Sequence, residues 1–111
     1  MSALPSLRRK ADFAAVTGRG SARSNRLLAL RYLPTDGPTR IGFSTPRTLG
    51  GAVERNRVRR RLRELLRARY GEMEIGWDLL LIARPAAGRA SFSELEEALG
   101  SLLRRSGITT S

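Results

Sequence analysis

The sequence predicts an α/β (α+β) two-layer sandwich, in which helices pack on a small mixed sheet in the order helix, strand, strand, helix, strand, helix. The nearly continuous apolar run from Trp77 to Ala83 is typical of a central strand covered on both faces. Two shorter apolar segments, residues 27–33 and 40–45, are separated by turn residues. Apolar residues recur with helical spacing in 52–70 and 91–105. This order leaves room for one extra short strand.

The length of 111 residues fits one compact domain, with residues 1–6 and 107–111 expected as flexible ends. No linker or repeat divides the chain. No window approaches the ~20 apolar residues that a membrane span requires. Residues 1–5 lack the charged and long apolar regions of a secretory signal, so we expect a cytoplasmic protein.

The first expected element is a short helix. Ser6 is placed to cap it, and Leu7 and Phe13 supply apolar side chains. Gly18 and Gly20 follow, and we expect the helix to end there.

Two strands are expected next. The segment from Leu27 to Leu33 places Leu28 and Tyr32 on one face. Residues 34–38, which include two prolines, an aspartate and a glycine, are typical of a turn, and a second strand follows near Arg40 to Thr45. The short separation of the two strands predicts an antiparallel hairpin.

A long helix is expected from about Ala52 to Tyr70, with Gly71 placed to stop it. Pro85 ends the central strand that follows. Ser91 and Glu94 then form the capping-box pattern that opens a last helix, whose leucines make an apolar stripe.

The chain contains neither cysteine nor histidine. Disulfides and thiolate metal sites are therefore excluded, and the commonest general base near neutral pH is missing. Asp12, Asp36 and Glu54 are isolated carboxylates, which are usually solvated. We expect no catalytic residue and no metal site on this chain.

The net charge of +11 is unevenly distributed. Residues 1–69 carry +13, whereas residues 70–103 carry −4. All but one of the 21 basic residues are arginine, which makes planar bidentate contacts with phosphate. One part of the chain therefore has the charge that polyanion binding requires.

The predicted long helix concentrates this charge. Its apolar side, which can pack on the sheet, is formed by Val58, Leu62, Leu65 and Leu66. Its far side carries what we call the arginine ridge: Asn56, Arg59, Arg60, Arg63 and Arg67. Arg57 and Arg61 lie on the flank. Like charges at this spacing repel by a few tenths of a kcal/mol per pair, and a phosphate backbone would relieve that repulsion. Charge alone leaves both RNA and DNA open.

The run from Arg55 to Glu64 resembles the RNR signature of the bacterial ribonuclease P protein family. Further pieces resemble family motifs in the same order along nearly the whole chain, from about Leu7 to Ile108: Asp12-Phe13, Gly20 with Asn25-Arg26, Gly42-Phe43-Ser44, Ile82-Ala83-Arg84-Pro85 and Ser91-Phe92-Ser93-Glu94-Leu95.

The resemblance implies a fold like domain 2 of ribosomal protein S5, with a left-handed crossover between parallel strands. It implies one RNA-binding domain, residues 1–111, that serves as the protein subunit of ribonuclease P, the endonuclease that removes the 5′ leader of precursor tRNA. The implied partners are the catalytic RNA, in a 1:1 complex, and precursor tRNA, with no DNA and no membrane. The catalytic RNA would hold most of the Mg²⁺ and hydrolyse the phosphodiester.

The resemblance also assigns roles by position. Contacts with the catalytic RNA fall to Arg55, Asn56, Arg57, Arg59, Arg60, Arg63 and Arg67, with Asn25 and Arg26 near the RNA surface. A cleft between the sheet and the first helix would hold the leader, lined by Phe13, Thr17, Arg31 and Tyr32. Thr17 and Arg31 stand where the family often has aromatic residues.

Other interpretations stay open. Phe13 is equally placed to be a core residue, and Asn25 and Arg26 to be turn residues without a ligand. A noncatalytic RNA-binding protein with the same fold, for instance one that binds ribosomal RNA, is the alternative function. A membrane-surface role for the basic helix is a distant third, because the core needs its apolar stripe.

Overall fold

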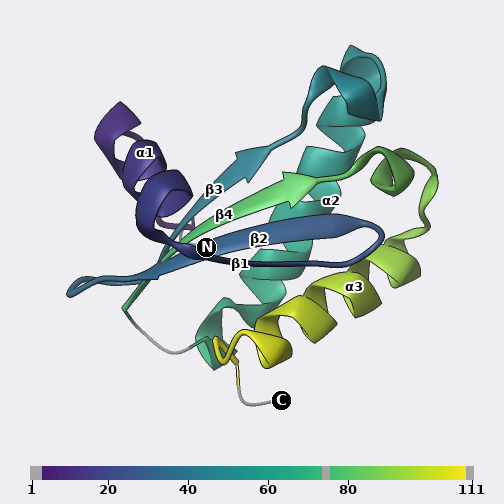
Figure 1. Ribbon diagram of the computed structural model, residues 1–111. Helices are drawn as coiled ribbons and strands as arrows, with labels where there is room; N and C mark the ends of the chain where they lie inside the picture. The colour runs from purple at the N-terminus through teal and green to yellow at the C-terminus, as the bar shows by residue number, and fades with distance from the viewer. Residues whose placement is uncertain (1–3, 74–75, 110–111) are drawn as a thin grey trace.

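The computed structural model describes residues 4–73 and 76–109, and shows helices on both faces of a four-stranded sheet (Figure 1). The helices are α1 (Lys10–Arg19), α2 (Ala52–Arg69) and α3 (Phe92–Arg105). The strands are β1 (Ser21–Ser24), β2 (Leu28–Pro34), β3 (Arg40–Ser44) and β4 (Trp77–Ala83). Short 3-10 turns join them at η1 (Arg47–Leu49), η2 (Tyr70–Glu72) and η3 (Pro85–Arg89). The predicted fold class is confirmed, and β1 is the extra short strand.

The strand order is β1-β2-β4-β3, so the expected hairpin between residues 27–33 and 40–45 is wrong. β4 lies between β2 and β3, antiparallel to β2 and parallel to β3. This apolar strand is buried along most of its length and pairs on both edges, with Leu81 opposite both Leu30 and Phe43. The antiparallel hairpin is β1–β2 instead. All four residues of β1 are exposed, so no apolar alternation marks it in the sequence.

The connection from β3 through α2 to β4 joins two parallel strands. With the strands seen pointing upward, α2 lies behind the sheet and β4 to the right of β3 (Figure 1). The crossover is therefore left-handed, against the usual right-handed preference of such connections and as the resemblance implies.

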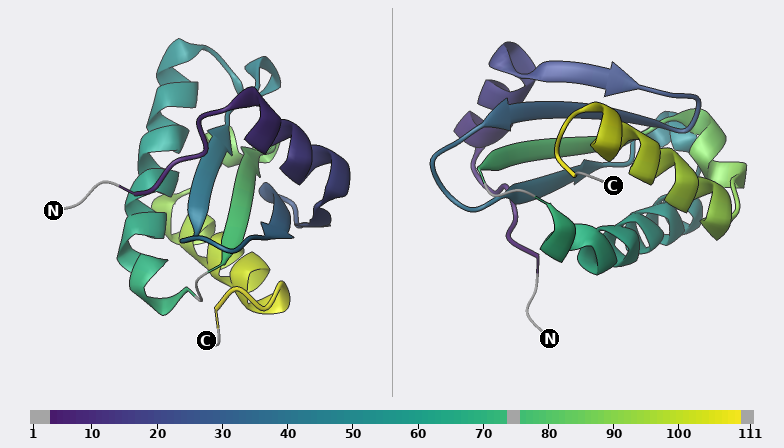
Figure 2. Two further views of the ribbon diagram at one scale, coloured as in Figure 1. Left: turned by 90° about the vertical axis from the view of Figure 1, so that its left-hand side faces the viewer. Right: turned by 90° about the horizontal axis from the view of Figure 1, so that it is seen from below.

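The main core lies between the sheet and the two long helices, α2 and α3 (Figure 2). Leu30 and Leu81 of the sheet are buried there. The predicted stripe of α3 is confirmed, because its four leucines are fully buried: Leu95, Leu99, Leu102 and Leu103. The predicted capping box also forms, with Ser91 N–H donating to Glu94 Oε1 at 2.8 Å and Glu94 N–H donating to Ser91 Oγ at 3.1 Å.

α1 covers the opposite face of the sheet, which we call the α1 face (Figure 2). A second, smaller hydrophobic cluster lies on this face and is formed by Leu7, Val16 and Leu80. The prediction that Ser6 caps the first helix is wrong, because the helix begins at Lys10. Ser6 instead forms a parallel bridge with Ile41, and Leu7 N–H donates to the Ile41 carbonyl at 3.1 Å. The backbone of this segment thus uses the edge of β3 before the chain turns into α1.

Two other boundaries differ from expectation. α2 ends at Arg69, and Gly71 lies inside the 3-10 turn that follows rather than stopping the helix directly. In the expected flexible end 107–111, Ile108 is fully buried and Thr109 forms a bridge with Met73. Residues 1–3 and 110–111 of the two expected ends lie outside the described residues.

Candidate nucleic-acid interface

The packing of α2 on the core determines the direction in which its arginines point. Its buried residues are the four predicted aliphatics, Val58, Leu62, Leu65 and Leu66. Glu54 lies in the first turn and Arg67 and Arg69 in the last, so each charge is near the helix end whose dipole favours it. The buried side fixes the rotation of the helix, and the arginine ridge lies on the side away from the core.

The arginine ridge has no acidic partner within the described part of the chain. Asn56, Arg60 and Arg63 are exposed, whereas Arg59 and Arg67 are half-buried. None of the described carboxylates lies within 4.0 Å of an α2 arginine nitrogen. No close ion pair therefore offsets the repulsion among these cations, and bound phosphates would relieve it while releasing counterions.

The side of the ridge next to β3 is held by contacts that the sequence analysis did not identify. Arg59 Nη1 donates to Asn56 Oδ1 at 3.0 Å, and its Nη2 donates to Thr45 Oγ1. The Arg63 guanidinium lies over the Phe43 ring, 5.8 Å from its centroid, in a cation–π contact. Held guanidiniums lose less side-chain freedom when they bind a ligand.

The flank of α2 next to α3 uses its arginines internally. Arg57 Nη2 donates to the Gly88 carbonyl at 3.1 Å, and Arg61 Nη1 donates to the Ala90 carbonyl at 3.3 Å. Arg57 Nε is buried without a hydrogen-bond partner among the described residues. Arg57, assigned by resemblance to RNA contact, therefore also fixes η3 against α2. Arg55 is half-buried, and its Nε donates to the Gly51 carbonyl at 3.4 Å.

Asn25 and Arg26 lie in the β1–β2 turn beside α3, apart from α1 (Figure 1). Asn25 Oδ1 accepts from the N–H groups of Leu27 and Leu28 at 3.1 and 3.0 Å, and its Nδ2 donates to the Ala98 carbonyl at 3.0 Å. Asn25 thus has the structural role of a turn residue. The Arg26 side chain is 71% exposed and lies 3.7 Å from Glu94, so it stays accessible.

Three of the four residues expected to line the leader cleft lie on the α1 face. The Phe13 ring covers Gly42, where an added Cβ would lie 2.7 Å from the ring. Thr17 is exposed on α1. Arg31 Nε donates to the Val16 carbonyl at 3.4 Å, and its Nη2 donates to the Thr17 carbonyl. Arg31 therefore holds the end of α1 as well as bringing charge to this face.

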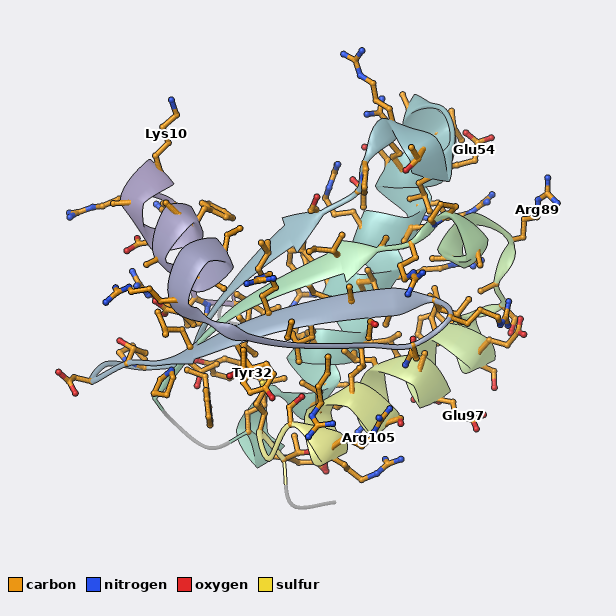
Figure 3. The ribbon with its side chains drawn as sticks, viewed as in Figure 1. Lys10, Tyr32, Glu54, Arg89, Glu97 and Arg105 are labelled. Carbon is orange, nitrogen blue, oxygen red and sulfur yellow. The ribbon has the colours of Figure 1, made fainter. Side chains whose placement is uncertain are left out.

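Tyr32 does not belong to this group. It packs against the main core, and its ring meets Trp77 edge-on with centroids 5.8 Å apart. In Figure 3 the Tyr32 side chain lies on the α3 side of the sheet, whereas Lys10 marks α1 on the other side. Successive residues of a strand point to opposite faces, so Arg31 and Tyr32 cannot line the same cleft.

Beside α1, the same face of the sheet is hollowed. The hollow has a volume of about 230 Å³ and is lined by Ala22, Arg23, Ser24, Ala29, Leu30, Arg31 and Ile82. Of the two arginines, Arg31 points to this face, whereas Arg23 pairs with the buried Leu30 and points to the opposite face. Small and apolar side chains with one arginine can accept the flat face of a base and an adjacent phosphate.

An ion-pair network that the sequence analysis missed also lies on this face. Arg40 of β3 donates to Asp78 of β4, from Nε to Oδ1 at 3.0 Å and from Nη2 to Oδ2 at 2.8 Å. Its Nη1 donates to Asp12 Oδ2 at 3.2 Å. The hydrogen bonds to Asp78 are the main cause that raises the pKa of Arg40 above its usual value. Asp12 is thus paired, not isolated as expected. An aspartate in the apolar strand 77–83 was the available signal, since a buried carboxylate requires a partner.

Neither a metal site nor a membrane span is found in the parts of the chain that the structure describes. Among residues 4–73 and 76–109, no three acidic side chains gather closely enough to hold a metal ion. No helix formed by these residues is both long and apolar enough to cross a bilayer.

The chain is similar to known proteins along nearly its whole length. The family model "Ribonuclease P" matches residues 1–107. A ribonuclease P protein component from Roseiflexus sp. is 46% identical over 71 residues, which cover 63% of this chain and 58% of that relative. Another from Clostridium kluyveri is 34% identical over 105 residues, 92% of this chain and 94% of that relative. The solved ribonuclease P protein from Thermotoga maritima is 28% identical, with a TM-score of 0.82 over 90% of this chain and 96% of that structure.

Proposed function

This chain belongs to the ribonuclease P protein family, and we propose that it works as the protein subunit of this tRNA-processing ribonuclease, bound to the enzyme's RNA subunit. The observation that carries the proposal is the arginine ridge, whose charges no described carboxylate neutralises. A helix face that is merely solvated normally mixes both signs of charge. The ridge instead suits the regularly spaced phosphates of RNA, and we assign it to the RNA subunit.

We assign the cleavage itself to the RNA subunit, which would hold the Mg²⁺ of the reaction. A protein that hydrolyses a phosphodiester uses a general base or metal ions held by its own side chains. This chain has no histidine or cysteine, and has ten acidic against 21 basic residues. Its cations would reduce the repulsion between the RNA subunit and precursor tRNA, so that cleavage needs less Mg²⁺.

We place the single-stranded 5′ leader of precursor tRNA on the α1 face. The half-buried Phe13 offers part of a ring for stacking, and the hollow beside α1 adds an apolar floor with Arg31. The sheet separates this face from the helices of the main core (Figure 2). One protein could therefore contact the RNA subunit and the leader at the same time.

A competition measurement tests the proposal against the alternative, a noncatalytic RNA-binding protein. The affinities of the purified protein for ribonuclease P RNA and for a ribosomal RNA fragment of equal length are compared at one salt concentration. Since both RNAs offer the same nonspecific charge, we expect a preference of about tenfold or more for ribonuclease P RNA. Equal affinities, or tighter binding of ribosomal RNA, would contradict the proposal.

A further inference from the structure

α1 is held on the sheet by little apolar packing. Val16 is the only residue of α1 that is fully buried. Arg9 is the N-cap residue of this helix, and its side chain makes no capping hydrogen bond. A helix with so little buried surface is expected to shift or open more readily than the rest of the fold. Its position over the α1 face therefore depends also on polar contacts, and Arg31 supplies one of them at the last turn, through the Val16 and Thr17 carbonyls.

Arg40 supplies such a contact at the first turn of α1. Two of its nitrogens bind both carboxylate oxygens of Asp78, whose side chain is only 7% exposed. This bidentate pair fixes the plane of the guanidinium. The remaining Nη1 points to Asp12 and binds its Oδ2 at 3.2 Å. The sheet thus holds the start of α1 through a guanidinium that is itself held in place.

The clamp of Asp12, Arg40 and Asp78 lies beside the ring expected to meet RNA. Phe13 follows Asp12 in the chain, and its ring covers Gly42, two residues after Arg40 on the same strand. A shift at Asp12 would therefore move the Phe13 ring across the sheet.

The charge of Asp12 is unfavourable for an RNA-binding face, because a carboxylate repels phosphate. Residues 1–69 contain only four acidic residues, and this one stands at the α1 face. The pair with Arg40 is partly exposed, with side chains 22% and 33% accessible, and such pairs stabilise a fold only weakly. RNA attraction therefore does not account for a carboxylate at this place. The dipole of α1 favours a carboxylate in its first turn, and the hydrogen bond to Arg40 adds a contact between α1 and the sheet.

We propose that Asp12 is a positioning residue: through Arg40 it holds α1 where Phe13 meets the single-stranded leader. The inference rests on the proposed leader contact and extends it to a residue that does not touch the RNA. It makes a prediction opposite in sign to simple electrostatics, because removal of a negative charge from an RNA-binding face would otherwise tighten binding.

The test uses the complex of the protein with its RNA subunit. Dissociation constants are measured for precursor tRNA with its leader and for the same tRNA without it. The constant without the leader divided by the constant with it gives the leader contribution, so a weaker leader contact lowers this ratio. Asp12→Ala is expected to lower this ratio about threefold to tenfold, because α1 then spends less time in the competent position. The matched control is Asp36→Ala, which removes the same charge from an exposed turn and should leave the ratio unchanged or slightly higher. An unchanged or increased ratio for Asp12→Ala would overturn the proposal.

Two further variants separate the possible failures. Asp12→Asn keeps an oxygen that can accept from Arg40, so its ratio should fall less than that of Asp12→Ala, and it replaces that variant if Asp12→Ala fails to fold. An equal or larger fall for Asp12→Asn would contradict the clamp. If Phe13→Ala leaves the ratio unchanged, the leader assignment itself fails. If Phe13→Ala lowers the ratio and the Asp12 variants do not, the leader assignment stands and the clamp is overturned.

Discussion

Arg59 Nη1 donates a hydrogen bond to Asn56 Oδ1 at 3.0 Å, so the uncharged residue of the arginine ridge orients one of its cations. The same guanidinium also donates to Thr45 Oγ1 on the other side. Arg59 is therefore held in one arrangement before any RNA arrives. Less side-chain entropy is then lost when it binds a phosphate.

Asn56→Ala should weaken binding of the RNA subunit about twofold to tenfold, because Arg59 would have to be ordered during binding. Stability should change little, since Asn56 is exposed. The affinities of Asn56→Ala, Arg59→Ala and the double variant form a thermodynamic cycle. If Asn56 acts through Arg59, Asn56→Ala should reduce RNA affinity less in the Arg59→Ala protein than in the parent protein. Equal reductions in the two proteins would contradict this role for Asn56.

Replacing Arg60 and Arg63 together with Ala should weaken RNA binding and flatten its dependence on salt. Each lost phosphate contact reduces the slope of log affinity against log salt by ~0.7–0.9. Titrations at several salt concentrations measure the slope, with Arg105→Ala, an exposed arginine at the end of α3, as the control. An unchanged slope in the double variant would place the ridge away from RNA in the complex.

Phe13→Ala should reduce affinity for leader-bearing tRNA and spare binding of the RNA subunit. Stacking of one base on an aromatic ring contributes ~1–3 kcal/mol, and the half-buried ring of Phe13 should give the lower end of that range. Tyr32→Leu removes an aromatic ring from the opposite face and serves as the control. The assignment of the α1 face would be wrong if the two variants lost leader affinity equally.

The capping box should make stability depend on pH in the acid range. The pKa of Glu94 lies below its usual value of 4.5, chiefly because Ser91 N–H donates to its carboxylate. A carboxyl group whose pKa is lowered by folding stabilises the protein above its unfolded-state pKa, and this stabilisation is lost as pH falls through the folded-state pKa. Urea unfolding should therefore show a smaller acid destabilisation for Glu94→Gln than for the parent protein. Parallel pH profiles of the two proteins would contradict this. Ser91→Ala removes the other half of the capping box and should lower the free energy of unfolding by about 1 kcal/mol at neutral pH.

The features that the sequence predicted correctly depend on local patterns. The strand 77–83 has an apolar run that only burial on both faces explains. Ser91 and Glu94 are three residues apart, as a capping box requires, and the aliphatic face of 52–69 fixes where its arginines point. The placement of Arg31 and Tyr32 on opposite faces was also available, since strand alternation alone requires it.

The errors concern pairings between distant segments. A short loop between residues 27–33 and 40–45 favours a hairpin, but the more apolar β4 takes the position between them. Nothing local to Ser6 shows that its backbone pairs with Ile41 instead of opening a helix. The contacts of Arg40 with Asp12 and Asp78 join residues 28 and 38 positions apart, and only the buried aspartate hints at them.

We propose that this chain supplies cations for an RNA that performs the cleavage. The most direct measurement is single-turnover cleavage of precursor tRNA at low Mg²⁺ by the RNA subunit alone, by the protein alone and by the two together. We expect rapid cleavage only by the mixture, with the RNA alone becoming competent as Mg²⁺ is raised. Cleavage by protein freed of all RNA, or a mixture no faster than the RNA alone, would contradict it.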